Sequence, residues 1–203
     1  MVVERLDPRP SAFVFSLRSV GYSLETAVAD IIDNSIAAGC SSIRVFFSNE
    51  QDSKLVLIDD GEGMDASELK EAMRLGSKSP MEQREHTDLG RFGLGMKTAS
   101  FSICKRLTVV SSNGNQRVAA RWDLDEIATN NAWNLDVLTP EEINELPFIE
   151  ELKSNGTAII WEKIDKIIDE SSRNKQKDLV SAISNLEKHL ALTFHRYIEG
   201  EKG

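Results

Sequence analysis

One amphipathic segment, residues 27–39, constrains the fold of this chain more than any other. Ser23 precedes it as an N-cap and Gly39 follows it as a left-handed stop, which predicts a helix over roughly residues 23–38. Its apolar side chains recur at the spacing of a half-buried helix, so we expect it to pack onto a sheet: Val28, Ile31, Ile32 and Ile36.

Two polar side chains share one side of this predicted helix. Asp30 and Asn34 lie four residues apart, so one stacks above the other. A carboxylate beside a carboxamide is suited to holding a metal ion and orienting a water molecule. A solvent-exposed polar edge would explain the pair equally well. The other motifs of the chain have to decide between these two interpretations.

Two glycine-rich stretches supply the next motifs. The β-rich run 54–58 leads directly into Asp59-Asp-Gly-Glu-Gly-Met64, where the glycines allow the backbone to approach another molecule closely. Gly90-x-x-Gly93-x-Gly95 opens a helix predicted to reach about residue 103, and its exposed amides and helix dipole favour an anion. A flexible hinge is the alternative. Lys97 comes one residue too late for a P-loop.

The remaining segments complete an alternation of helices and strands. Residues 76–89 are polar and without period, which indicates a functional lid or a disordered segment. Asn113-Gly-Asn predicts a hairpin between strands 106–110 and 117–122. The last helix carries an apolar stripe typical of core packing or of contact with a further segment. The other predicted elements are helices 11–20, 65–75, 140–146 and 173–198, and strands 43–47, 135–138 and 156–161.

Composition limits the class of protein. With 203 residues, 40% of them hydrophobic and 28% charged, the chain fits one large or two small globular domains. The net charge of -9 disfavours direct nucleic-acid binding. Cys40 and Cys104 are too few for a disulfide framework, which indicates a reducing compartment. Without a signal peptide or a membrane-spanning run, we predict a cytoplasmic protein that has no membrane partner.

Taken in chain order, four motifs resemble the four boxes of the GHKL ATPases, the superfamily of gyrase, the ninety-kilodalton heat-shock chaperone, sensor histidine kinases and MutL. They are Asp30-x-x-x-Asn34, Asp59-x-Gly61-x-Gly63, Gly90-x-x-Gly93-x-Gly95 and Gly156-Thr157. The resemblance covers roughly residues 20–162. The stretch Gly90-Arg-Phe-Gly-Leu-Gly-Met-Lys-Thr-Ala looks most like the MORC and MutL branch. Histidine kinases fit less well, because residues 1–22 are too short for a phosphoacceptor helix.

The resemblance implies an α/β (α+β) two-layer sandwich of the Bergerat type, with a mixed, mostly antiparallel sheet and helices on one face. It divides the chain into a flexible lead-in, an ATP-binding domain with a lid at 76–96, and a C-terminal helix leading towards a transducer domain: residues 1–10, 11–170 and 171–203. Because the chain ends at Gly203, we expect it to be an N-terminal fragment of a longer protein.

The resemblance also implies roles for single residues. Asp59 would accept a hydrogen bond from the adenine amino group, and Thr157 would support that contact through an ordered water. Met64 would form an apolar wall, and Asn34 would coordinate Mg²⁺. Gly61 and Gly63 would let the purine lie against the backbone. The phosphates and the rest of the nucleotide would contact Ala38, Ser77, Lys78, Gly90, Phe92, Gly93, Leu94, Gly95, Met96 and Lys97.

Two departures from the family pattern affect the implied activity. Asp30 stands where a catalytic glutamate is usual, and Ala37 stands where aspartate is common. A reacting group displaced by about 1 Å can lose ~100-fold in rate. We therefore expect Mg²⁺-dependent ATP binding with slow hydrolysis to ADP, in a clamp that forms a homodimer when ATP binds. A non-hydrolysing ATP switch and, less favoured, a protein kinase are the alternatives.

Overall fold

A six-stranded sheet forms the centre of the computed structural model, which describes residue 4 and residues 8–19, 21–49, 52–76, 95–167 and 175–198. The strand order is β1-β2-β6-β3-β4-β5, and every recorded pairing is antiparallel. The predicted α/β class is thereby confirmed, although no parallel pair appears among the described strands. The strands are Ile43–Ser48 (β1), Lys54–Asp59 (β2), Cys104–Asn113 (β3), Arg117–Asp123 (β4), Asp136–Val137 (β5) and Asn155–Ile164 (β6).

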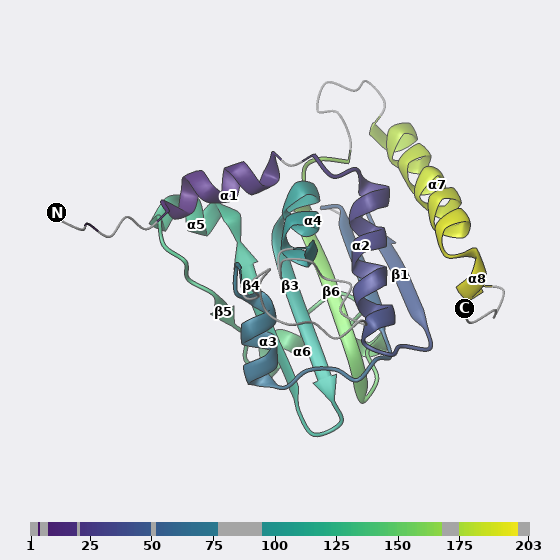
Figure 1. Cartoon of the computed structure of the whole chain (residues 1–203), viewed down its shortest axis with the longest axis horizontal. Helices are drawn as coiled ribbons and strands as arrows, with labels where there is room; N and C mark the ends of the chain where they lie inside the picture. The colour runs from purple at the N-terminus through teal and green to yellow at the C-terminus, as the bar shows by residue number, and fades with distance from the viewer. Residues whose placement is uncertain are drawn as a thin grey trace.

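Helices cover one face of this sheet. In Figure 1, α2 and α4 lie across the near face, and α7 packs on the outer side of α2. The predicted caps of α2 are present, because the Ser23 side chain accepts from the Thr26 amide and Gly39 has a φ of 71°. The helices are Pro10–Arg18 (α1), Leu24–Ala37 (α2), Ala66–Met73 (α3), Gly95–Ile103 (α4), Leu124–Asn130 (α5), Pro140–Asn144 (α6), Lys175–Thr193 (α7) and His195–Ile198 (α8).

The two faces of the sheet bury separate clusters, since side chains alternate along each strand. Leu55 and Leu57 of β2 point into the larger core beneath the helices. Val56 and Ile58 point to the opposite face, where residues 138–152 cover them. Helices were expected on one face only. The short α6 and a 3₁₀ turn at Ile149–Glu151 add partial cover on the other.

Two local predictions needed correction. Helix α5 was not foreseen, although its Asp123 N-cap and acidic first turn are visible in the sequence. The predicted helix 173–198 is two helices, which meet at the buried Phe194. Residues 173 and 174 lie outside the described part of the chain. Within that part, no helix combines the length and apolar character needed to cross a membrane.

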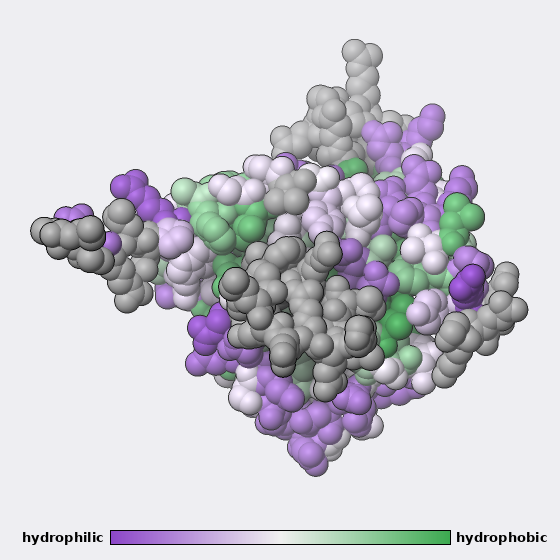
Figure 2. Space-filling model, in the orientation of Figure 1, coloured by the Kyte–Doolittle hydropathy of each residue, from purple (hydrophilic) through white to green (hydrophobic). Residues whose placement is uncertain are grey.

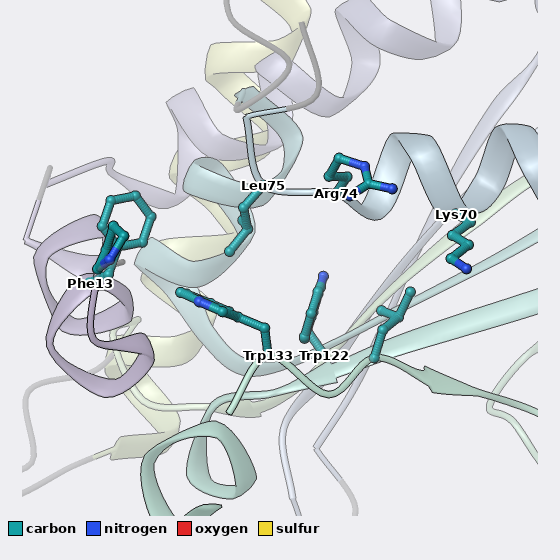
Figure 3. A pocket seen from close by; sticks show the side chains of 8 residues that line it. Phe13, Lys70, Arg74, Leu75, Trp122 and Trp133 are labelled. Atoms are coloured by element: carbon teal, nitrogen blue, oxygen red, sulfur yellow. The ribbon is translucent and has the colours of Figure 1, made fainter. Parts of the chain in front are cut away.

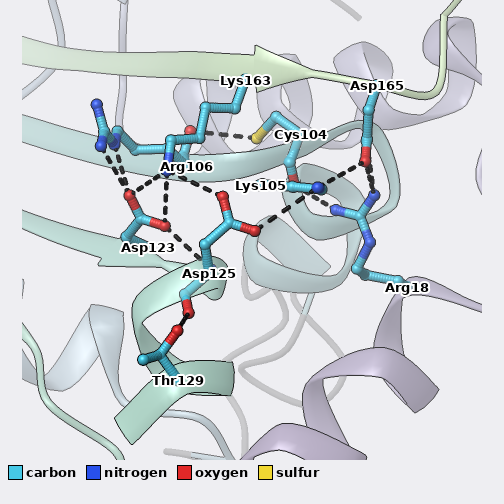
Figure 4. A network of polar contacts seen from close by, with 9 residues as sticks. All are labelled: Arg18, Cys104, Lys105, Arg106, Asp123, Asp125, Thr129, Lys163 and Asp165. Carbon is cyan, nitrogen blue, oxygen red and sulfur yellow. Dashed lines mark hydrogen bonds and ion pairs between the residues drawn. The ribbon is translucent and has the colours of Figure 1, made fainter.

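A network of ion pairs joins α1 and α5 to the neighbouring ends of three strands (Figure 4). Arg18 of α1 donates to both carboxylate oxygens of Asp165, at 2.6 and 2.7 Å. Asp123 accepts from Arg106 and Lys163 at the ends of β3 and β6. Burial opposes ionisation of Asp123, but the hydrogen bonds from Lys163 and Arg106 hold its pKa below the ordinary value. The network therefore fixes α1 against the sheet.

Candidate functional site

The carboxylate of Asp59, the last residue of β2, lies beneath α2 and accepts hydrogen bonds at both of its oxygens. Its Oδ1 accepts from the backbone amides of Gly61 and Thr157, each at 3.0 Å. Its Oδ2 accepts from the Ser35 hydroxyl at 2.7 Å. The side chain is buried. Donors from the following loop, from β6 and from α2 therefore hold the carboxylate in one orientation.

Strand register brings the partners of Asp59 together. Pairing of Ile58 with Ala158 sets Asp59 opposite Thr157, and the next strand sets Ser111 opposite Thr157. The Ser111 and Thr157 hydroxyls are 2.9 Å apart, and Ser111 Oγ accepts from the Met64 amide at 2.8 Å. A row of polar side chains thus crosses three strands on the helix-covered face.

Ser35 and Ser111 were not foreseen as site residues. Ser35 lies among the apolar positions of α2, and a buried serine on such a face was the one available signal. Ser111 continues the β3 run without any local mark. Only the packing of α2 over the sheet and the register of β3 bring the two hydroxyls into the Asp59 group.

The glycines around Asp59 are required by the protein's own packing. A Cβ at Gly63, which has a φ of +74°, would lie 1.9 Å from the Ser112 carbonyl oxygen. A Cβ at Gly156 would lie 2.0 Å from the Asp59 carbonyl oxygen, and one at Gly61 would lie 2.9 Å from that of Ala38. The expected contact of Gly61 and Gly63 with a purine stays a prediction, but close packing already explains both residues.

Gly63→Ala is expected to destabilise the fold by about 3 kcal/mol or more, because it adds a backbone clash to an unfavourable φ. Gly39→Ala is the matched control: its φ is +71°, but a Cβ there would meet nothing within 4 Å, so we expect about 1 kcal/mol. Urea unfolding of both variants measures the difference. Equal losses would show that the contact with β3 contributes nothing.

Asp30 and Asn34 occupy the predicted positions on α2. Asn34 is exposed, and its Nδ2 donates to the Asp30 carbonyl at 2.7 Å, which leaves its Oδ1 as the end able to meet a cation. Asp30 is half-buried. Burial of the Tyr22 phenol, followed by the hydrogen-bonding influence and the charge of the Asp30 carboxylate, raises the pKa of Tyr22, which places the two side chains next to each other. Tyr22 was also not foreseen.

Lys97 does not join the Asp59 group in this structure. It lies in α4 with only 2% of its surface exposed, and its Nζ donates to the carbonyl of Ala72 near the end of α3, at 2.6 Å. Burial lowers the pKa of Lys97 to about 8, against the opposing charge of Glu71. The predicted contact of Lys97 with phosphate stays a prediction.

The lowered pKa of Lys97 predicts a pH-dependent stability. Between about pH 8 and 10.5 the unfolded chain binds this proton and the folded chain has lost it, so the contribution of Lys97 to stability rises with pH. Relative to Lys97→Met, the unmodified protein is expected to gain about 2 kcal/mol between about pH 7.5 and 9.5. Urea unfolding across that range tests this, and parallel curves would contradict it.

The other predicted contact residues divide into two groups. Ala38 adjoins Gly61 and accepts from the Glu62 amide at 3.2 Å, which places it beside the Asp59 loop. Gly95 and Met96 begin α4, where Met96 packs against the larger core. Outside the described residues lie Ser77, Lys78, Gly90, Phe92, Gly93 and Leu94.

A family model and several known proteins resemble part of this chain. A family model described as "Histidine kinase-, DNA gyrase B-, and HSP90-like ATPase" matches residues 22–157. Human ATPase MORC2 is 32% identical over 83 residues, covering 39% of this chain and 8% of MORC2. DNA mismatch repair protein MutL of Buchnera aphidicola is 31% identical over 118 residues, covering 57% of this chain and 20% of that protein. The matches thus span a small part of each relative.

Proposed function

Because the chain belongs to the histidine kinase-, DNA gyrase B- and HSP90-like ATPase family, we propose that it binds ATP with Mg²⁺ beneath α2 and hydrolyses it slowly. The observation that carries the proposal is the fixed carboxylate of Asp59. A buried carboxylate held by three donors is an oriented acceptor. Such a group suits recognition of one exocyclic amine, which adenine presents.

Adenine recognition would use Oδ2 of Asp59. Oδ1 already accepts hydrogen bonds from two backbone amides, whereas Oδ2 accepts one, from the Ser35 hydroxyl. A carboxylate oxygen has two lone pairs, so Oδ2 retains an acceptor site for the adenine amine. The Thr157 amide donates to the same carboxylate, and its hydroxyl, 2.9 Å from that of Ser111, would hold the ordered water of the predicted contact.

The amide oxygen that Asn34 offers on α2 is a suitable ligand for one magnesium ion. Mg²⁺ prefers oxygen ligands and commonly takes one or two from protein, with the rest from water and phosphate. Asn34 offers its exposed amide oxygen, and among the described residues no cluster of three His, Cys, Asp or Glu side chains could hold a metal ion. When bound, the ion would neutralise charge on the triphosphate oxygens.

Hydrolysis would depend on Asp30, one turn before Asn34 on α2. The carboxylate would orient a water towards the γ-phosphorus and take its proton as the bond to ADP breaks. The neighbouring Tyr22 hydroxyl would donate to that carboxylate and hold it in place. Aspartate is one methylene shorter than the glutamate expected here, and this supports slow turnover.

We extend the proposal to a clamp in which ATP binding promotes a homodimer of a longer protein, in the cytoplasm. The family membership supports the clamp, and the small share of each relative that the matches cover supports the longer protein. The short carboxylate of Asp30 also supports a second candidate, in which ATP assembles a complex without useful hydrolysis. The division into a lead-in, an ATP-binding domain with a lid, and a C-terminal helix stays a prediction.

Isothermal titration calorimetry tests the binding proposal directly. We expect ATP with Mg²⁺ to bind at one site per chain, and EDTA to weaken binding about tenfold or more because the Asn34 contact is lost. GTP is the matched control, because guanine lacks an amine at the position where adenine would meet Asp59, and it should bind at least about tenfold more weakly. Absence of any heat with ATP and Mg²⁺ would refute the proposal.

A further inference from the structure

A cavity of about 410 Å³ lies away from the Asp59 group, between α1, the end of α3, β4 and the loop before β5. Figure 3 shows its lining, with Phe13 at one end, Lys70 at the other, and Trp122, Trp133 and Leu75 directed into the space between them. Its volume falls in the range of about 300–1,000 Å³ that is usual for small-molecule sites.

Aromatic rings form its main wall. The Trp133 ring makes edge-to-face contacts with Phe13 and Trp122, with ring centroids 5.9 and 6.1 Å apart. Trp122 is held by a hydrogen bond from its Nε1 to the Met73 carbonyl at 3.0 Å. Trp133, in contrast, is 37% exposed. A rigid wall with one accessible indole favours a flat aromatic guest.

The charged side chains in the described lining are both positive. Lys70 and Arg74 lie one turn apart at the end of α3, and the described lining contains no acidic side chain. Nε of Arg74 donates to the Glu71 carboxylate at 2.9 Å in an exposed ion pair. The two terminal guanidinium nitrogens of Arg74 then remain to meet a ligand. On a chain with a net charge of -9, two adjacent cations beside an aromatic wall favour an anionic group.

We propose that this cavity is a second ligand site, which takes a small planar aromatic molecule carrying one anionic group. The ring contacts Trp133 and Trp122, and the anion meets Lys70 and Arg74. Carboxylate and phosphate satisfy these cations equally, so the ligand class is an aromatic carboxylate or an aromatic phosphate. The site is argued independently of the ATP proposal, because none of the lining residues that the structure describes belongs to the Asp59 group.

Fluorine NMR with ring-fluorinated probes tests the site. The probes are fluorinated indole-3-acetate, fluorinated indoxyl phosphate, and the neutral alcohol corresponding to the acetate. We expect the fluorine resonance of one or both anions to broaden on binding, with saturation at millimolar concentration. The alcohol should bind about tenfold more weakly. The better of the two anions identifies the anionic group. Failure of both anions to bind, or equal binding of the alcohol, would overturn the proposal.

Variants locate the bound probe. Trp133→Ala should weaken all three probes, whereas Lys70→Gln with Arg74→Gln should weaken only the anions, about tenfold. The matched control, Lys188→Gln with Arg196→Gln, removes two exposed cations from α7 and α8 and should change nothing. Binding should persist in Asp59→Asn and with saturating ATP. Displacement by ATP would place the probes in the nucleotide site and overturn this proposal alone.

Discussion

Asp59→Asn is expected to weaken ATP binding by about 100-fold. The amide oxygen would replace Oδ1, because two backbone amides donate there. The amide nitrogen would then replace Oδ2 and present hydrogens to the adenine amine, itself a donor. Calorimetry with ATP and Mg²⁺ measures the loss.

The fold should tolerate this substitution, because the Ser35 hydroxyl can rotate and accept from the new amide. Urea unfolding of Asp59→Asn serves as the control for stability. Ser35→Ala is the matched variant: it removes one donor to the carboxylate but keeps both acceptor oxygens, so we expect a loss of about tenfold or less. If Asp59→Asn bound ATP as tightly as the unmodified protein, adenine recognition would have to lie elsewhere.

Asp30→Asn is expected to lower ATP turnover by at least about 100-fold while leaving ATP affinity nearly unchanged, because general-base catalysis contributes ~10²–10⁴ in rate. The substitution keeps the size of the side chain and the helix surface, but removes the proton acceptor. Single-turnover hydrolysis with enzyme in excess separates this effect from product release.

Two further variants decide how Asp30 acts. Asp30→Glu restores the missing methylene and should raise turnover, which separates a slow ATPase from a switch that does not hydrolyse. Tyr22→Phe should lower turnover several-fold without changing ATP affinity, since it removes the hydroxyl that would hold Asp30. Unchanged turnover in Asp30→Asn would remove Asp30 from the catalytic mechanism.

Most elements of the fold were predictable because their signals are local. Ser23 and Gly39 mark the ends of α2, the Asn113 turn joins β3 to β4, and short β-rich runs mark the strands. The missed α5 has seven residues, too few to show a helical period. The break at Phe194 was missed because the apolar stripe of the last helix continues through it.

The sequence by itself determined the strand that ends at Asp59, the helix that carries Asp30 and Asn34, and the family to which both belong. Tertiary structure alone decided that Ser35 and Ser111 join the carboxylate site, that Lys97 lies against α3, and that Trp122 meets Trp133 in the wall of a cavity. The physical reason is distance along the chain. Capping and periodicity act within a few residues, whereas strand register and helix packing join residues far apart, and no local pattern encodes those pairings.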